Sequence, residues 1–219
     1  MLSKRELNKK QGFIFDFDGT LVDSMWIWDN LLIDFLNKYG YLTPQRLLDE
    51  VAYMSLEQSS KYVCSLYDLP LTPKQVYGEW NDMIYDGYAC EIRLKPYADE
   101  YLRSLRRDKK TLAIATANNR ELTEACLKNN GFEGFFDVYT YADEVGIGKS
   151  DPKIYLETLR RMDMKVDDAV LFEDILKALE TAKSIGLDVV IAEDKSAGHN
   201  REQLKAAADL YISDFGELL

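Results

Sequence analysis

Histidine is almost absent from this chain of 219 residues, which limits the catalytic chemistry open to it. The single histidine, His199, lies in the polar stretch 196–200, far from any motif, so Ser–His or Cys–His catalysis is disfavoured. Cysteine is scarce too. Cys64, Cys90 and Cys126 form no CxxC pair, which argues against a zinc site and against a disulfide framework. We expect three core thiols.

Positive charge is in the minority, with 27 Lys and Arg against 38 Asp and Glu and a net charge of −11. This balance argues against nucleic acid or an anionic membrane as the main partner. No apolar run reaches the roughly 18 residues of a membrane span, and residues 1–10 contain no signal-peptide core. We therefore expect a cytoplasmic protein, with a monomer as the default state.

Glycine-rich phosphate loops are also missing. Gly148–Lys149–Ser150 has the end of a P-loop, but Asp143 stands where that motif requires its first glycine. No GxGxxG sequence is present either. A nucleotide-binding loop of either kind is therefore not indicated.

Short apolar runs at 12–15, 111–115, 169–172 and 188–192 predict strands, and 209–212 predicts a weaker edge strand. Their continuous apolar character is typical of strands covered on both faces, as in a parallel sheet. Helical periodicity separates them, with helix starts predicted at Pro96 and at Asp151–Pro152. The predicted fold class is α/β with a parallel sheet.

Residues 25–93 have a different texture, with helical periods and no convincing strand. An apolar stripe stops at Gly40, and helix starts are predicted at Thr43–Pro44, Ser55 and Thr72–Pro73. We expect an inserted helical domain over 25–93 and a core of 1–24 and 94–219, joined by two connections that could act as a hinge. Aromatic residues of the insert could be bundle core or pocket wall: Trp26, Trp28, Tyr53 and Tyr85.

Polar residues follow three of the predicted strands. Asp16 and Asp18 end the first, Thr116–Ala117–Asn118 end the second, and Glu173–Asp174 end a third. Each group alone could be an ordinary turn or helix cap. Ligands bind at the carboxyl ends of strands in open parallel sheets, so together these groups predict one site. Its carboxylates and hydroxyl are the hard oxygen ligands that Mg²⁺ prefers.

A site of acids and Mg²⁺ without a histidine suits phosphoryl transfer through a carboxylate nucleophile, which forms an aspartyl-phosphate. Positive charge is then needed beside the phosphoryl oxygens. Lys149 lies in the chain where it could reach the same edge of the sheet, although a solvated loop lysine is the simpler interpretation of that residue alone.

The four segments Asp16–Ser24, Thr116–Asn118, Gly148–Pro152 and Phe172–Asp174 resemble, in order and spacing, the motifs of the haloacid dehalogenase superfamily. With the helical insert, the chain is similar to the capped branch that includes phosphoglycolate phosphatases and beta-phosphoglucomutase. The resemblance implies a Rossmann-like core with a mobile cap, Mg²⁺ dependence, and hydrolysis or transfer of a phosphoryl group from a small metabolite.

The resemblance also implies a role for each residue. Asp16 would be the nucleophile, and Asp18 would protonate the leaving oxygen and then activate water. The phosphate would be held by Thr116, Ala117, Asn118 and Lys149, and the metal by Asp16, Asp18, Asp174 and Glu173. Whether Glu173 binds the metal directly stays open. Lys153 is a less favoured alternative to Lys149.

Departures from the family pattern separate the possible activities. The related dehalogenases lack an acid where this chain has Asp18, which disfavours dehalogenation. The mutases carry a cap arginine where this chain has Leu56, and the fourth motif continues with Ile175 in place of the usual serine. A phosphatase is the leading hypothesis, a beta-phosphoglucomutase-like mutase is the alternative, and a catalytically silent acidic binding module is a third.

Overall fold

The computed structural model describes residues 2–51 and 54–219, without the side chains of Asp29 and His199. Tyr53, one of the aromatic residues considered for the pocket, therefore lies outside the described residues. A six-stranded sheet in the order β3-β2-β1-β4-β5-β6 forms the centre, and all its pairings are parallel. The strands are β1 (Gly12–Phe15), β2 (Thr111–Thr116), β3 (Val138–Tyr141), β4 (Ala169–Glu173), β5 (Asp188–Ala192) and β6 (Leu210–Ile212). The predicted α/β class with a parallel sheet is confirmed.

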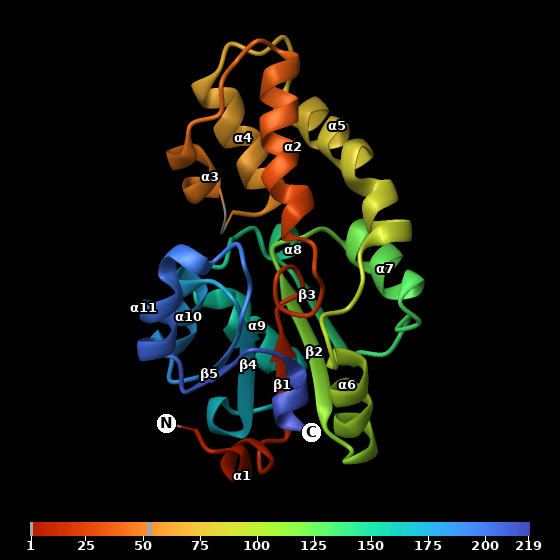
Figure 1. Cartoon of the computed structure of the whole chain (residues 1–219), viewed down its shortest axis with the longest axis vertical. Helices are drawn as coiled ribbons and strands as arrows, with labels where there is room; N and C mark the ends of the chain where they lie inside the picture. The colour runs from red at the N-terminus through yellow and green to blue at the C-terminus, as the bar shows by residue number, and fades with distance from the viewer. Residues whose placement is uncertain (1, 52–53) are drawn as a thin grey trace.

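Helices cover both faces of the sheet, which explains the continuous apolar strands (Figure 1). In β1, Phe13 and Phe15 pack on one face and Ile14 on the other, and all three are fully buried. The first face is covered by α6 (Ala98–Arg107), α7 (Arg120–Asn129) and the 3₁₀ turn η4 (Phe215–Leu218). The second is covered by α9 (Lys153–Arg161), α10 (Leu176–Ser184) and α11 (Arg201–Ala207). The short helices α1 (Lys4–Leu7) and α8 (Ala142–Val145) and the turns η2 (Val166–Asp168) and η3 (Gly198–Asn200) complete this part of the chain.

Two elements differ from the sequence-based expectation. β3 was not predicted, because this edge strand is buried only at Thr140 and Tyr141 and its sequence Val-Tyr-Thr-Tyr has no continuous apolar run. Helix α6 begins at Ala98, so the predicted start at Pro96 is wrong. Tyr97 adopts a left-handed conformation (φ 63°), which turns the chain between Pro96 and the helix.

Between β1 and β2 the chain forms a group of helices beyond one end of the sheet (Figure 1). They are α2 (Met25–Lys38), α3 (Gln45–Val51), α4 (Leu56–Leu66), α5 (Pro73–Asp86) and the π-helical turn η1 (Gly87–Glu91). The capping boxes at Ser55 and Thr72 are formed, and Gly40 has a φ of +81° just beyond α2. In their core, Trp80 packs edge-on against Phe35 with ring centroids 5.4 Å apart.

The two connections between these helices and the sheet lie side by side. The Asp23 amide donates to the Arg93 carbonyl (3.0 Å), and the Lys95 amide donates to the Leu21 carbonyl (2.8 Å). Val22 and Leu94 also form an isolated antiparallel bridge. The backbone therefore enters and leaves the helical group through one paired segment.

The cysteines do not all belong to the core. Cys126 is buried, Cys64 is partly buried and Cys90 is exposed on η1. The expectation of three core thiols is therefore wrong, because the π-helical turn presents Cys90 to solvent.

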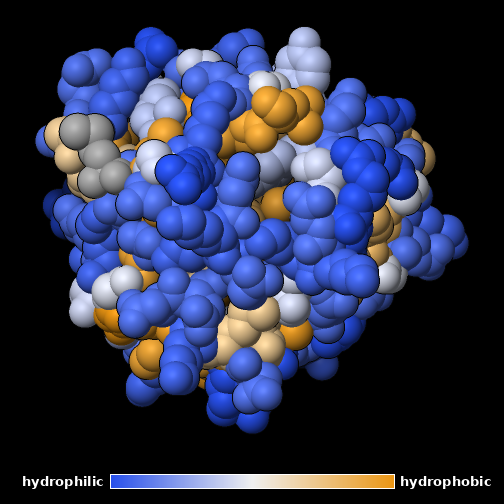
Figure 2. All heavy atoms as spheres, turned by 90° about the horizontal axis from the view of Figure 1, so that it is seen from below, coloured by the Kyte–Doolittle hydropathy of each residue, from blue (hydrophilic) through white to orange (hydrophobic). Residues whose placement is uncertain are grey.

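The end of the molecule away from the helical group is mostly hydrophilic. Apolar side chains appear there in small separate groups among polar ones (Figure 2). Among the helices that the structure describes, none is long and apolar enough to cross a membrane. The cytoplasmic location and the monomeric state stay predictions.

Candidate active site

The carboxyl ends of the three central strands bring four polar residues together. Asp16 follows β1, Thr116 ends β2, Glu173 ends β4 and Asp174 comes next. The Asp16 amide donates to the Phe172 carbonyl (2.9 Å), which continues the β1–β4 ladder up to the site. All four side chains are buried, with exposures of at most 3%. Parallel pairing therefore fixes these residues on rigid backbone at a single edge.

Three acids form a compact group at this edge. Asp16, Glu173 and Asp174 each offer a carboxylate oxygen, and these oxygens lie within 4.8 Å of one another. Buried carboxylates this close need a cation or protons between them, because like charges repel strongly away from water. The group has the oxygen ligands that suit a hard divalent cation.

Lys149 lies against the same acids. It comes from the loop after α8, is only 3% exposed, and forms ion pairs with Asp16 and with Glu173 (Nζ to Oε1, 2.5 Å). Burial alone would lower the pKa of Lys149, but Asp16 and Glu173 outweigh it and raise that pKa well above its usual value. Lys149 therefore stays charged. Lys153 has a side chain 72% exposed and pairs loosely with Asp151, so it lies outside the site.

Both carboxylate oxygens of Glu173 accept hydrogen bonds, from this lysine and from the backbone. One carboxylate oxygen accepts from Lys149, and the other accepts from the amides of Asp174 (2.8 Å) and Ile175 (3.1 Å). Asp16 and Asp174 have fewer such bonds, so they are the better candidates for direct contact with a cation. Glu173 is placed to orient Lys149 and the loop that carries Asp174.

The turn after β1 supplies two residues that the sequence analysis did not single out. The Thr20 hydroxyl lies 3.0 Å from Oδ1 of Asp174 and 3.4 Å from Oδ2 of Asp16, so it bridges two acids. Gly19 has a φ of +74°, and a Cβ there would lie 2.3 Å from Oδ2 of Asp174. The only sequence signal for a role of Gly19 and Thr20 in the site was their position inside the Asp16–Ser24 segment.

The carboxylate of Asp18 does not join the group of three acids among the described residues. It accepts hydrogen bonds from the hydroxyl of Ser24 (2.6 Å), from the phenol of Tyr88 and from the amide of Asn118 (2.8 Å). The metal contact predicted for Asp18 therefore stays a prediction. Asp18 is instead held in one orientation at the edge of the cavity.

Tyr88 was not found from the sequence. It is fully buried on η1, donates to Asp18, and accepts from the indole of Trp28 (2.7 Å). Burial, followed by the charge of Asp18, raises the pKa of Tyr88 well above its usual value, so it remains a neutral donor. Because 70 residues separate it from Asp18, no local pattern could have signalled this contact.

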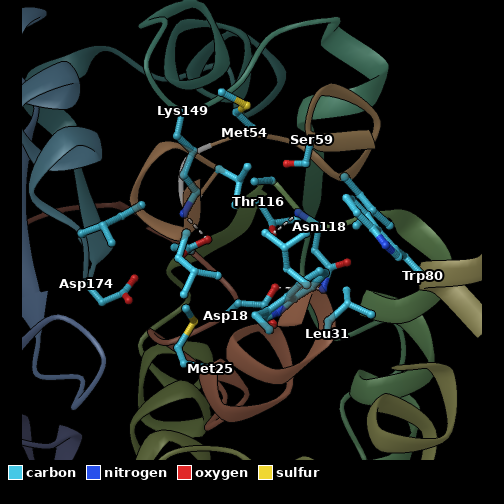
Figure 3. Close-up of a pocket in the computed structure, with 18 residues that line it drawn as sticks. Asp18, Met25, Leu31, Met54, Ser59, Trp80, Thr116, Asn118, Lys149 and Asp174 are labelled. Carbon is cyan, nitrogen blue, oxygen red and sulfur yellow. Dashed lines mark hydrogen bonds and ion pairs between the residues drawn. The ribbon is translucent and has the colours of Figure 1, made fainter. Parts of the chain in front are cut away.

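The loop after β2 lies beside Asp18. Its three residues Thr116, Ala117 and Asn118 line the cavity, and the backbone amide of Asn118 donates to the Thr116 hydroxyl (3.0 Å). Figure 3 shows Thr116 and Asn118 close to Asp18 and on the same cavity as Lys149. A small anion bound in this cavity would thus meet a hydroxyl, a backbone turn and an ammonium group.

One lysine cannot neutralise the three acids if all of them are ionised. The pKa of Asp16 is raised to about 7, because burial and, to a lesser extent, Glu173 raise it by more than Lys149 lowers it. Burial, then Glu173 and Asp16, raise the pKa of Asp174 well above its usual value. Lys149 alone therefore does not keep Asp16 ionised, and a divalent cation at this group would supply the missing charge.

A cavity of about 160 Å³ opens onto these residues from the helical group. Asp16, Asp18, Lys149 and Asp174 line one side of it, and residues from α2 to α5 line the other (Figure 3). Trp28 is one of these lining residues. Trp26 and Tyr85 are 45% and 38% exposed and do not line the cavity.

Comparison with known proteins agrees with this arrangement. The family described as haloacid dehalogenase-like hydrolase matches residues 13–192. A probable pseudouridine-5'-phosphatase of Drosophila melanogaster is 25% identical, over 98% of this chain and 97% of that protein. The validoxylamine A 7'-phosphate phosphatase of Streptomyces hygroscopicus subsp. limoneus is 30% identical over 94% of each chain.

The fold has a close counterpart among solved structures. The crystal structure of CbbY from Rhodobacter sphaeroides in complex with phosphate superposes with a TM-score of 0.82 and 23% identity, over 95% of this chain and 96% of that one. The match to the family covers all three strand ends that carry the acids, Thr116 and the lysine loop between them. The chain belongs to the haloacid dehalogenase-like hydrolases.

Proposed function

We propose that this protein is a Mg²⁺-dependent phosphatase that hydrolyses a small phosphorylated metabolite through an aspartyl-phosphate on Asp16. One observation carries the proposal: the Asp16 carboxylate is paired with buried Lys149, shares a compact acid group with Asp174, and borders a cavity. The phosphatases named above among its relatives support the same reaction class.

The residues fit a divalent cation held by Asp16 and Asp174, with Glu173 close by. When bound, the cation would offset the charge of the phosphoryl oxygens and favour the ionised form of Asp16. The compact group of oxygen ligands suits Mg²⁺. Through its hydroxyl, Thr20 would restrain the two liganding carboxylates at a fixed distance from each other.

Two displacements at phosphorus follow from this arrangement. In the first, a carboxylate oxygen of Asp16 bonds to phosphorus as the ester bond breaks, and Asp18 gives its proton to the leaving oxygen. In the second, Asp18 takes a proton from water, which attacks the same phosphorus. Inorganic phosphate leaves and the Asp16 carboxylate is restored.

The remaining residues position and neutralise the transferred group. Lys149 balances charge on Asp16 and on the phosphoryl oxygens, while Thr116, Ala117 and Asn118 surround those oxygens. Asp18 is oriented by Ser24, by Tyr88 and by Asn118, so its reacting oxygen cannot rotate freely. Fixed orientation of this kind accounts for a large share of catalytic power in such sites.

We further propose that residues 25–93 form a cap on a core of residues 1–24 and 94–219. The paired connections at Leu21–Asp23 and Arg93–Lys95 would act as its hinge. Asn81 on α5 contacts α7 by accepting from Asn119 (2.8 Å) and donating to Glu121 (3.0 Å). These bonds support a closed form that keeps water away from the aspartyl-phosphate.

The geometry gives the mutase alternative no support. Leu56 lines the cavity at the place where the mutase pattern has an arginine, and it is 4% exposed. A leucine cannot hold the second phosphate that such a reaction needs.

Phosphate release from 4-nitrophenyl phosphate tests the proposed function. We expect release that requires Mg²⁺, stops with EDTA and is lost in Asp16→Asn. Asp82→Asn is the matched control, because Asp82 is exposed on α5. Release that persists in Asp16→Asn would contradict the proposal, as would full activity without a divalent cation.

A further inference from the structure

The wall of the cavity opposite the acids is almost entirely apolar over the residues that the structure describes. Of these, the lining residues from α2 to α5 are Met, Leu, Val or Trp, except Ser59. Figure 3 shows Leu31, Met54, Ser59 and Trp80 around the space beside Thr116 and Asn118. The part of a substrate that lies beyond its phosphoryl group would meet this wall.

Asp18 and Asn118, on the core side of the cavity, already have hydrogen-bond partners within the protein. The Asp18 carboxylate accepts three hydrogen bonds, one of them from the side-chain amide of Asn118. The side-chain oxygen of Asn118 accepts from the backbone amide of Asn119 (2.8 Å). A substrate hydroxyl that entered the cavity would lose its bonds to water and find few partners in exchange. An apolar group would lose nothing and would gain contacts.

The size of the cavity limits the substrate as well. At about 160 Å³ it is close to the roughly 150 Å³ of an apolar protein cavity that takes up benzene. The phosphoryl group also needs room beside Asp16 and Lys149. The space left suits a short branched chain or a single ring.

We infer that the preferred substrate of this phosphatase is the phosphate monoester of a small apolar alcohol, and that phosphorylated sugars and polyols are poor substrates. The inference rests on the proposed function, because it assigns the leaving group of that same reaction. It separates this chain from phosphatases whose leaving group carries many hydroxyls. Hydrophobic pockets discriminate against an added hydroxyl by about a hundredfold.

Two pairs of primary phosphate esters with matched shapes test the inference with the wild-type protein. In 2-methylbutyl phosphate, methyl groups replace both hydroxyls of glycerol 3-phosphate; cyclohexylmethyl phosphate is the apolar counterpart of glucose 6-phosphate. All four are esters of primary alcohols, so differences report binding of the leaving group. We expect kcat/KM to be at least about tenfold higher for the apolar member of each pair.

A polar substitution in the wall adds a second measurement. Met54→Gln keeps the length of the side chain and should narrow the ratio of kcat/KM within each pair. Met83→Gln is the control, because Met83 is exposed on α5 and lies outside the cavity; it should leave the ratio unchanged. If Met54→Gln does not fold, the comparison of the wild-type pairs stands by itself.

The outcomes separate this inference from the proposed function. Equal or faster hydrolysis of the polyol esters, still lost in Asp16→Asn, would overturn the inference alone. No phosphate release from any of the four esters would overturn the proposed function and the inference with it.

Discussion

The phenol of Tyr88 donates a hydrogen bond to the carboxylate of Asp18, and so joins the helical group to the turn after the first strand. Ser24, at the start of α2, donates to the same carboxylate oxygen. Two of the three donors on Asp18 thus come from the segment at or beyond the proposed hinge. The orientation of the proposed proton carrier therefore depends on how these helices sit against the sheet.

Tyr88→Phe tests this dependence. Removal of the phenol leaves Asp18 with fewer restraints and the Trp28 indole without its acceptor, so we expect kcat to fall about ten- to a hundredfold. The free energy of unfolding should fall by roughly 1 kcal/mol. Tyr101→Phe is the control, because the Tyr101 hydroxyl is buried without a partner among the described residues. An unchanged kcat in Tyr88→Phe would contradict the positioning role.

Lys149→Met tests the buried cation. The substitution keeps the chain length but leaves Asp16 and Glu173 unpaired, so we expect kcat/KM to drop by at least about a hundredfold. Breaking a buried ion pair should also lower the free energy of unfolding by about 3 kcal/mol or more at neutral pH. Steady-state kinetics and urea unfolding measure both effects.

Lys153→Met provides the comparison for that variant. Lys153 is exposed and its ion pair with Asp151 is long (3.9 Å), so activity and stability should stay near wild type. A large loss of activity in Lys153→Met, with a mild effect in Lys149→Met, would show that Lys153 and not Lys149 has the cationic role.

Thr20→Val tests the bridge between the acids. Loss of the hydroxyl frees the carboxylates of Asp16 and Asp174 to move apart, and we expect Mg²⁺ affinity to weaken about ten- to a hundredfold. Saturating Mg²⁺ should restore much of the rate. Thr140→Val is the control, because the Thr140 hydroxyl is buried without a partner in the described part of the chain. Titration calorimetry would contradict the bridge if both variants bound Mg²⁺ equally well.

The pH dependence of stability tests the charge balance of the acids. The pKa of Asp16 is raised from 3.8 to about 7, mainly by burial, so between these values the folded protein holds a proton that the unfolded chain has released. Proton linkage then requires the metal-free protein to lose stability as the pH rises through this range. Urea unfolding in EDTA at several pH values measures the slope.

Asp16→Asn should flatten that slope, and Mg²⁺ should stabilise the wild type more at pH 8 than at pH 6, because the acids release protons when a cation binds. Rising stability of the metal-free wild type between pH 5 and pH 7 would contradict this account.

Much of the fold was predictable because its signals are local. Continuous apolar runs marked the buried strands, and capping boxes at Ser55 and Thr72 marked two helix starts. β3 was not predicted, because this edge strand is buried over only part of its length and therefore lacks a continuous apolar run. Tyr97 shifted the start of α6 through a backbone conformation that residue type does not signal.

The acids of the site were predictable for the same kind of reason. In a parallel sheet, the end of each apolar run places the next residues at one edge, so Asp16, Thr116 and Glu173 had to lie near one another once the strands were recognised. The sequence alone therefore determined five of the six strands and the candidate nucleophile, together with the family to which the chain belongs.

Tertiary structure decided the rest. Contacts over long separations turned the Asp18 carboxylate toward Tyr88, committed Glu173 to Lys149, and enclosed an apolar cavity above the acids. Each depends on how helices pack in space, because a hydrogen bond or a cavity wall is set by distance and burial, and neither is written in the local pattern of residues.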